Sequence, residues 1–388
     1  MALMGIDIGS TNVKCVIVDS QGKVLGLSKM RSPTGILDIQ NLQTCVSALC
    51  RDALASAGPC KIEGMAVASV GCGAIYLDKN LMQLKIEDPG YIDPLQGISE
   101  REYMNISGYP KHYSSGGMVL ARAMHAGTTC DICHFLSVVD YINFYLTGVM
   151  KRELSTASSM QLLDKQSGGD WQEFFEAYKI DAKVLPEICK SGEYIGKLTA
   201  KDCGLPVGTP VFAGGHDYLC AAYAAGCYKQ GDIINVLGTY EMTAAFFEAP
   251  QKNFDEANIL SFMDHHTFPG RYTITAEHLG PGNNPKPQAI SEANQKSATA
   301  ISYLQSKISN KNTRIKVVGG GTNSPFWLQD KANTLNQDLI IPKIKEATAT
   351  GAALLAGYGC KIYQSHKEAT QVYEGKEEII KSKDEIKR

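Results

Sequence analysis

A single carboxylate, Asp217, follows two glycines in the stretch Val211-Phe-Ala-Gly-Gly-His-Asp217. The apolar start of this stretch is typical of a buried strand, and the alanine-rich segment Leu219–Ala225 has high helix propensity. A strand, a glycine turn and a helix start would place Asp217 at the edge of a cleft, where it can accept a proton from a ligand. The alternative is that Asp217 only caps the helix, since aspartate is favoured there. Glycine-rich turns elsewhere in the chain favour the first interpretation.

A tight turn near the N-terminus carries groups that bind phosphate. The turn Gly9-Ser10-Thr11-Asn12 lies between two apolar runs, which is typical of a strand, a turn and a second strand. Its backbone N–H groups, its two hydroxyls and Lys14 can hold phosphate oxygens. Asp7 stands just before the turn, where a carboxylate can reach phosphate-bound Mg²⁺ directly or through water. The alternative is an ordinary hairpin, because a Gly-x-Thr pattern alone occurs in many turns.

The same pattern recurs in the second half of the chain. The run Asp232–Leu237 leads into Gly238-Thr239, and a further strand pattern follows. Two matching hairpins, one in each half, predict a duplicated domain with a cleft between the copies. A third turn, Gly319-Gly320-Gly321, follows a strand pattern and precedes a helix pattern over 325–336. Its glycines would let a flat ring or a ribose lie against bare backbone. The spacing is not G-x-G-x-x-G, which counts against a nicotinamide-dependent dehydrogenase.

Other segments complete the expected elements. A helix is predicted over 40–57, and a buried strand over 65–70 ends in a Gly71-Cys72-Gly73 loop that could border a pocket. Residues 79–118 are rich in glycine, proline and charged side chains, which predicts loops that either bind a polar substrate or are simply solvated. The remaining expectations are helices over 135–146, 171–178 and 346–356, a small-residue turn at 155–159, and a solvated helix or frayed tail over 361–388.

Composition is that of an ordinary soluble globular protein. The 388 residues are enough for two domains, and the formal net charge of −2 gives no field that would attract nucleic acid or an anionic membrane. No apolar run approaches the ~20 residues of a membrane span, and the N-terminus lacks the basic region of a signal peptide. The twelve cysteines are scattered, as expected for reduced thiols in the cytoplasm. The Cys130-Asp-Ile-Cys133 pair has no second pair to complete a metal site, so core thiols are expected.

Taken together, these segments resemble the FGGY carbohydrate kinases of the actin/hexokinase/Hsp70 ATPase superfamily. The resemblance runs from Met4 to about Ser365, and its specificity lies in the order and spacing of modest motifs. The motifs are Asp7-Ile-Gly-Ser-Thr11, Ser155-Thr-Ala-Ser158 with Leu162-Leu-Asp164 and Trp171, Leu185-Pro186 with Ile195-Gly196, Gly214-Gly-His-Asp217, Gly238-Thr239, Val318-Gly-Gly-Gly321 with Trp327 and Gln329, and Glu346 with Gly351-Ala-Ala-Leu-Leu355.

The resemblance implies an α/β fold of two ribonuclease H-like (actin-like ATPase) domains with a cleft between them. The expected limits are 1–228, 229–365 and a charged tail over 366–388. It also implies ATP-dependent phosphorylation, with Mg²⁺, of a sugar or polyol hydroxyl. A ketose such as xylulose or a related pentulose is favoured by its frequency in the family, while fuculose, gluconate, glycerol and the autoinducer-2 precursor are left open. A homodimer is also left open. The residues matched to these roles are Asp217 as catalytic base; Asp7 for metal; Gly9, Ser10, Thr11, Asn12, Lys14, Gly238 and Thr239 for phosphates; Gly320, Gly321 and Asn323 for adenosine; and Cys72, Gly73, Asp93, Arg101, His216 and Asp217 for the sugar.

Two departures from the family pattern stand out. The Trp-x-Asp-x-Arg type of sugar-binding segment is not recognisable near residues 85–101, where Asp93 and Arg101 are only loose counterparts. Between Phe247 and Lys316 the chain is shorter than the family norm, and Gly280–Pro285 stands where a Gly-Glu-Arg-x-Pro-like stretch is expected. The alternative to a kinase is a catalytically weak nucleotide-binding regulator of the same superfamily. The presence of Asp217 argues for the enzyme.

Overall fold

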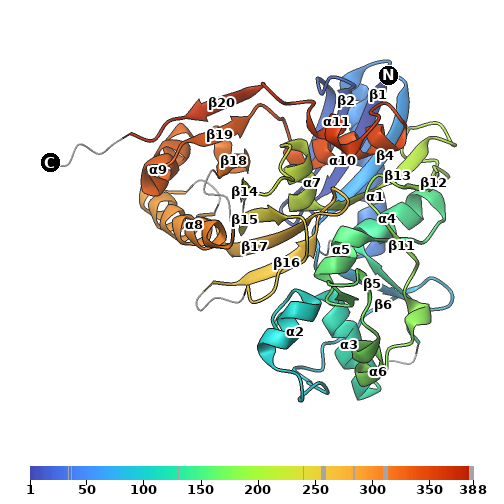
Figure 1. The fold of residues 1–388 in the computed structure, drawn as a ribbon. Coiled ribbons are helices and arrows are strands. Elements are labelled where there is room, and N and C mark those ends of the chain that lie inside the picture. Colours follow the sequence, from blue (N-terminus) through green and yellow to red (C-terminus); the bar gives the residue numbers. More distant parts are fainter. Residues whose placement is uncertain are drawn as a thin grey trace.

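Two mixed β-sheets with helices packed against them form the body of the molecule (Figure 1). The computed structural model describes residues 1–33, 35, 37–128, 131–238, 240–254, 259–282, 285–308 and 313–383. The strands of the first sheet come from residues 2–216 and those of the second from residues 232–380. The predicted domain boundary at 228 therefore lies between the strands of the two sheets.

The first sheet has the order β12-β13-β4-β1-β2-β3. Strands β1, β2 and β3 form an antiparallel meander. Strands β4 and β13 run parallel to β1, and β12 is the edge strand, antiparallel to β13. Alternate residues of β1 point to opposite faces, so Met4 and Ile6 pack against α1 and α4. The bounds are β1 Ala2–Ile8, β2 Asn12–Asp19, β3 Val24–Arg31, β4 Ile62–Ser69, β12 Tyr194–Lys197, β13 Pro210–His216, α1 Ile39–Ala57 and α4 Val138–Thr147.

The second sheet repeats this plan in the order β16-β17-β15-β14-β18-β19-β20. Here β14 pairs antiparallel with β15 and parallel with β18, and β20 is an antiparallel edge on β19. This repetition confirms the predicted two-domain actin-like ATPase fold. The bounds are β14 Asp232–Leu237, β15 Tyr240–Phe247, β16 Ser261–His265, β17 Tyr272–Leu279, β18 Arg314–Gly319, β19 Leu339–Pro342 and β20 Glu377–Ile380, with α8 Pro287–Lys307 and α9 Pro325–Leu335 packed on one face.

Two small-residue helices, α7 (Asp217–Ala224) and α10 (Ala347–Gly359), lie between the sheets. Helix α10 comes from the second half of the sequence but packs on the first sheet, as Figure 1 shows. The approach is very close, because a Cβ added to Gly5 would lie 1.8 Å from the carbonyl oxygen of Ala349. Similarly, a Cβ on Gly351 would lie 1.9 Å from the carbonyl oxygen of Cys220 in α7. Glycine at both positions therefore permits this packing.

A smaller unit with its own apolar core projects below the first sheet in Figure 1. It contains helices within the stretch 79–118 that was predicted as loops, so that prediction is wrong for α2 and the start of α3. Serine caps explain both helices, since Ser99 accepts from Glu102 N and Ser115 accepts from Met118 N. The bounds are β5 Ala74–Leu77, β6 Gln83–Leu84, β7 His134–Ser137, β9 Leu163–Asp164, β10 Gly169–Asp170, α2 Glu100–Ser107, α3 Gly116–Ala126, α6 Gln172–Tyr178 and the 3₁₀ turn Ala182–Val184.

Three further expectations differ from the structure. The predicted turn at 155–159 is helix α5 (Leu154–Ser159), because the Glu153 carboxylate caps it by accepting from Thr156 N. The helix predicted from 135 begins at Val138, after strand β7. The predicted terminal tail is α11 (His366–Thr370) followed by β20, and Tyr363 and Tyr373 are buried against the first sheet. Within the described residues, no helix is both long and apolar enough to cross a membrane.

Candidate active site

Most of the predicted site residues lie near the carboxyl ends of the parallel strands, where ligands bind in open α/β sheets. In the first sheet, β1 leads into the Gly9 turn, β4 into the Gly71 loop and β13 into Asp217. In the second sheet, β14 leads into Gly238 and β18 into Gly319. The duplicated topology therefore places one set of loops at the carboxyl ends of the parallel strands in each sheet.

Asp217 is the first residue of α7, and its side chain is 31% exposed. Its Oδ1 atom accepts from Tyr218 N at 2.6 Å and lies 2.8 Å from His216 Nδ1. Both described hydrogen bonds use Oδ1, which leaves Oδ2 to face a ligand. Burial lowers the pKa of His216, but the hydrogen bond and charge of Asp217 outweigh it, so the pKa is raised above its ordinary value. The His216 ring lies against Gly71, where a Cβ would come within 2.0 Å of Nε2.

A second charged group forms around Asp7 at the end of β1. Its Oδ2 lies 3.7 Å from Lys14 Nζ, which also pairs with Glu346 Oε2 at 2.8 Å. Glu346 stands at the start of α10 with a backbone φ of 50°, a conformation that non-glycine residues rarely adopt. Such local strain is often found at functional sites. Glu346 was matched to the family by motif, but sequence reasoning gave it no role.

Burial raises the pKa of Asp7 from 3.8 to about 7, against the pull of Lys14, and the negative charges of Asp217 and Glu346 raise it further. Two carboxylates thus share one lysine while Asp217 adds a third negative charge near Asp7, an arrangement that suits an added cation. Among the described residues, no group of three or more His, Cys, Asp or Glu side chains could hold a metal by itself. A single buried carboxylate suits Mg²⁺, because protein-bound Mg²⁺ usually keeps water and phosphate oxygens as most of its ligands.

The turns predicted to bind nucleotide lie in both halves. Gly9–Thr11 is held by the end of β3, where Ser32 Oγ donates to Gly9 O at 2.6 Å and Ser32 N donates to Thr11 O at 3.0 Å. Gly238 is exposed, and Thr239 lies outside the described residues. Gly319 has a φ of 99° and lies against Leu237, so the third turn is adjacent to the end of β14.

The adenosine-site candidates form a 3₁₀ turn, Gly320–Asn323. A Cβ on Gly320 would meet no atom within 4 Å, so this glycine borders open space. Asn323 Nδ2 donates to Gly320 O at 3.1 Å and fixes the turn. By contrast, Gly321 is packed against Leu237 and Trp327, so a larger residue at this position would clash with them. The role of these residues in adenosine binding remains a prediction.

On the substrate side, Cys72 Sγ lies 3.3 Å from Tyr113 OH. Burial raises the pKa of the Cys72 thiol to about 12, assisted by the charges of Asp264, Glu277 and Asp217. Gly73 packs tightly, because a Cβ would lie 2.9 Å from Leu37.

Glu277 in β17 faces this region from the second sheet. Thr273, Thr275 and Glu277 share one face of the strand, and both threonine hydroxyls contact Tyr218 OH, at 3.3 and 3.1 Å. Burial raises the pKa of Glu277, with opposing contributions from His216 and Asp217. Glu277 and Tyr113 were both missed by sequence reasoning, since neither lies in a motif.

Asp93 and Arg101 have different surroundings. Asp93 pairs with Lys111 at 3.0 Å and accepts from Leu95 N, which stabilises a loop of the smaller unit. Arg101 is exposed on α2. No contact described for either residue joins it to Asp217, so their assignment to the sugar stays a prediction from the resemblance.

The backbone before Asp217 is held by a buried carboxylate, Glu153. His216 N donates to Ser155 Oγ at 2.9 Å, and Ser155 Oγ donates to Glu153 Oε2 at 2.7 Å. Ser191 Oγ donates to the other oxygen of Glu153 at 2.7 Å. Each carboxylate oxygen thus has a donor, and the result is a rigid support for His216 and Asp217.

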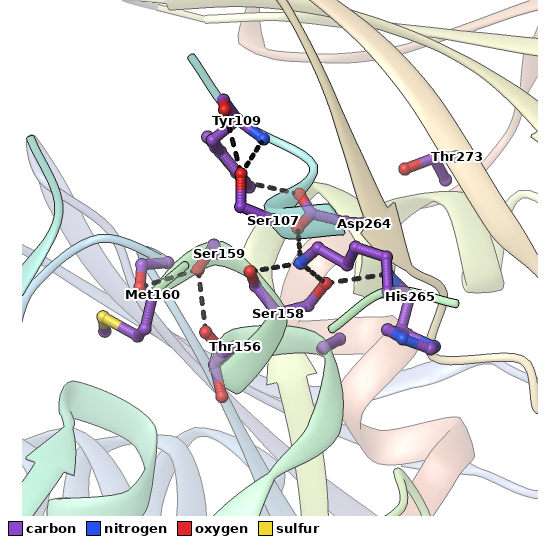
Figure 2. A network of polar contacts seen from close by, with 12 residues as sticks. Ser107, Tyr109, Thr156, Ser158, Ser159, Met160, Asp264, His265 and Thr273 are labelled. Atoms are coloured by element: carbon purple, nitrogen blue, oxygen red, sulfur yellow. Dashed lines mark hydrogen bonds and ion pairs between the residues drawn. The ribbon is translucent and has the colours of Figure 1, made fainter. Parts of the chain in front are cut away.

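Figure 2 shows a second buried network, with Ser158, Asp264 and Tyr109 among its members. Lys165 belongs to this network through its contacts with Ser158 and Asp264. Asp264 Oδ2 accepts from Tyr109 OH at 2.7 Å and from Tyr218 OH at 3.1 Å. Tyr218 belongs to α7, Asp264 to the second sheet, and Tyr109 and Lys165 to the smaller unit. The network therefore joins all three parts of the molecule next to Asp217.

Comparison with known proteins identifies the family. The model of the FGGY carbohydrate kinase N-terminal domain matches residues 121–224, and that of the C-terminal domain matches residues 290–360. The chain belongs to the FGGY family of carbohydrate kinases. FGGY kinases are sugar phosphotransferases that use ATP, which assigns the chain to that enzyme class.

Relatives of this FGGY chain span nearly its full length. It is 24% identical to the L-fuculokinase of Escherichia coli (strain K12) over 445 residues, covering 95% of this chain and 94% of that protein. It is 20% identical to the xylulose kinase of Lactococcus lactis over 461 residues, covering 96% and 90%. A gluconate kinase structure from Lactobacillus acidophilus has a TM-score of 0.84 at 17% identity, with 98% and 94% covered. A xylulose kinase structure from Rhodospirillum rubrum has a TM-score of 0.80 at 16% identity, with 99% and 95% covered.

Both sequence alignments are longer than the 388 residues of this FGGY chain, so the relatives carry segments without a counterpart here. In this chain β17 ends at Leu279 and α8 begins at Pro287. Glu277 lies near the end of β17.

Proposed function

We propose that the chain transfers the γ-phosphate of ATP to a hydroxyl of a ketose sugar such as xylulose or fuculose. The observation that carries the proposal is the position of Asp217. Its carboxylate stands at a strand-to-helix junction, is bonded through Oδ1 alone, and faces the charged group around Asp7. This arrangement is what a general base for phosphoryl transfer requires.

In the proposed step, a sugar hydroxyl donates its proton to Asp217 Oδ2 while its oxygen attacks the γ-phosphorus. The bond between that phosphorus and the β–γ bridging oxygen breaks, and ADP leaves with the electron pair. His216 and Tyr218 N hold the carboxylate in place, which lowers the entropy cost of reaching the reactive geometry.

The two phosphate turns would hold the triphosphate through backbone N–H groups and hydroxyls, with Lys14 offsetting negative charge. The candidates are Gly9–Asn12 in the first half and Gly238-Thr239 in the second. Asp7 would hold Mg²⁺ through one carboxylate, and a bound Mg²⁺ supplies charge neutralisation of the phosphates. Gly320 and Asn323 border the space proposed for adenosine.

A ketose is proposed because the relatives are named L-fuculokinase and xylulose kinase. In this chain, the first half would line the sugar site with Cys72, Tyr113 and His216. The second half would contribute Glu277, which would accept hydrogen bonds from sugar hydroxyls. We place the reaction in the cytoplasm, because ATP is available there and the described cysteines are free thiols.

The test is ADP release from ATP and Mg²⁺ with a panel of ketoses, aldoses, polyols and gluconate. The expected result is stimulation by one or a few ketoses, with kcat reduced roughly 10²–10⁴-fold in Asp217→Asn, the range for loss of a general base. Asp52→Asn, an exposed aspartate on α1, is the matched control and should behave as wild type. Near-normal turnover in Asp217→Asn would contradict the assignment.

The shortened second half favours one other candidate, a nucleotide-binding regulator with little catalytic activity. If the chain binds ATP while no sugar on the panel stimulates ADP release, this candidate replaces the kinase. Calorimetric titration with ATP and Mg²⁺, carried out beside the sugar panel, separates the two.

A further inference from the structure

A cavity separate from the cluster around Asp217 lies where the turn after β16 meets the segment following β11 (Ile188–Cys189). It contains about 350 Å³ of empty space, including the part open to solvent. The polar side chains that line it include His265, His266 and Arg271 from the second half and Lys190 and Ser191 from the first. The cavity is therefore a junction between the two halves of the chain.

Two buried hydrogen-bond donors at this cavity have no acceptor. His266 Nδ1 accepts from Phe268 N at 2.7 Å, so in the neutral ring the proton is on Nε2. Burial lowers the pKa of His266 to about 3, which keeps the ring neutral at physiological pH. His266 as a whole is only 4% exposed, yet its Nε2 has no hydrogen-bond partner. The Nε–H group of Arg271 is likewise buried and without a partner.

Unpartnered buried donors are rare in folded proteins, since each one loses its hydrogen bonds to water without replacement. His265 Nε2 is a third buried nitrogen without a partner on the same wall. Arg271 pairs with Glu248 through Nη2 at 3.1 Å, which leaves its Nε edge for another acceptor. A ligand that accepts several hydrogen bonds at once would satisfy these groups.

The charge around the cavity selects the class of ligand. Lys190 and Arg271 are cations, and none of the described residues lining the cavity is a carboxylate. We propose that this cavity binds a small oxyanion, namely phosphate, either free or as the phosphate group of a phosphorylated sugar. A phosphate offers acceptor oxygens to His266 Nε2–H and Arg271 Nε–H and charge to both cations.

The experiment is calorimetric titration of the full chain at constant ionic strength, with saturating Mg²⁺ and a non-hydrolysable ATP analogue to fill the nucleotide turns. One titration adds inorganic phosphate and the other adds a sugar monophosphate. The compound that binds more tightly shows whether the phosphate is free or part of a sugar. Arg271→Gln should weaken binding at least tenfold. Arg51→Gln, which removes an exposed guanidinium on α1, should leave it unchanged.

His266→Gln provides a second variant at the cavity, tested after circular dichroism confirms that it is folded. Weaker binding in both cavity variants supports the site. Absence of binding to wild type in both arms, or equal binding in wild type and Arg271→Gln, overturns the proposal. Binding that disappears when the nucleotide analogue is added belongs to the nucleotide turns and also overturns it.

Discussion

Lys14 Nζ lies 2.8 Å from Glu346 Oε2, so a strand of the first sheet is ion-paired with the start of α10 from the second half. Asp7 completes this group, with Oδ2 at 3.7 Å from the same lysine. One cation is thus shared by two carboxylates, while Asp217 adds a further negative charge nearby. The group therefore carries more negative than positive charge, and removing one carboxylate should stabilise it.

Asp7→Asn should stabilise the protein at neutral and alkaline pH. The pKa of Asp7 is raised from 3.8 to about 7, so between these values the native state binds more protons than the unfolded state. Stability contributed by this group therefore falls as pH rises from about 4 to 7. The variant should gain on the order of 1–4 kcal/mol at pH 8 and little near pH 4, measured by urea unfolding.

The same variant should lose its response to Mg²⁺. Mg²⁺ with ADP should raise the melting temperature of wild type more than ADP alone, and this difference should vanish in Asp7→Asn. A variant that is less stable than wild type at pH 8, or that keeps the full response to Mg²⁺, would contradict the role given to Asp7.

Glu277→Gln should weaken sugar binding selectively. A hydrogen bond between a carboxylate and a hydroxyl is worth about 1.5–3 kcal/mol, so KM for the sugar should rise roughly tenfold or more. KM for ATP should stay constant, since the charged groups that act on Glu277 are His216 and Asp217. Glu173→Gln, exposed on α6, is the matched control. Equal changes in both KM values would show that Glu277 acts only through the fold.

Asp264→Asn should destabilise the molecule by about 3–5 kcal/mol, because it leaves the buried Lys165 without its opposite charge. Adding Lys165→Met to this variant should recover part of the loss, since the unpaired ammonium is then removed. The unfolding free energies of wild type, both single variants and the double variant give the coupling between the two residues. If the two single substitutions change the free energy of unfolding additively, Asp264 and Lys165 do not stabilise each other.

Gly5→Ala should cost about 3 kcal/mol or more, because the new methyl group would meet the Ala349 carbonyl oxygen at 1.8 Å. Gly97→Ala is the matched control, since a Cβ there meets no atom within 4 Å. Urea unfolding compares the two. A small effect at Gly5 would show that α10 can move away from β1.

Features that depend on local sequence were predictable. The hairpins on either side of Gly9 and Gly238, and the strand that leads to Asp217, follow from apolar runs and glycine turns close together in the chain. Their repetition in the two halves predicted the duplicated sheet. In each case the pattern and the structure involve the same few residues.

Features that depend on distant contacts were not predictable. Helix α5 forms from serine and threonine because Glu153 caps it, and β20 forms because β19 offers an unpaired edge. Glu277 reaches the site only through its position along β17, and Tyr113 through its contact with Cys72. No motif contains these residues, so only the assembled fold reveals them.

The packing of α10 bears on how the protein is made. Leu3, Val16 and Ala66 on the first sheet are covered by Ala349, Ala353 and Tyr363, which are synthesised long after them. Strands β1, β2 and β4 must therefore wait, with one apolar face open to water, until α10 has been synthesised. During that interval a nascent chain would depend on chaperones, and a product truncated before residue 347 would expose a surface prone to aggregation.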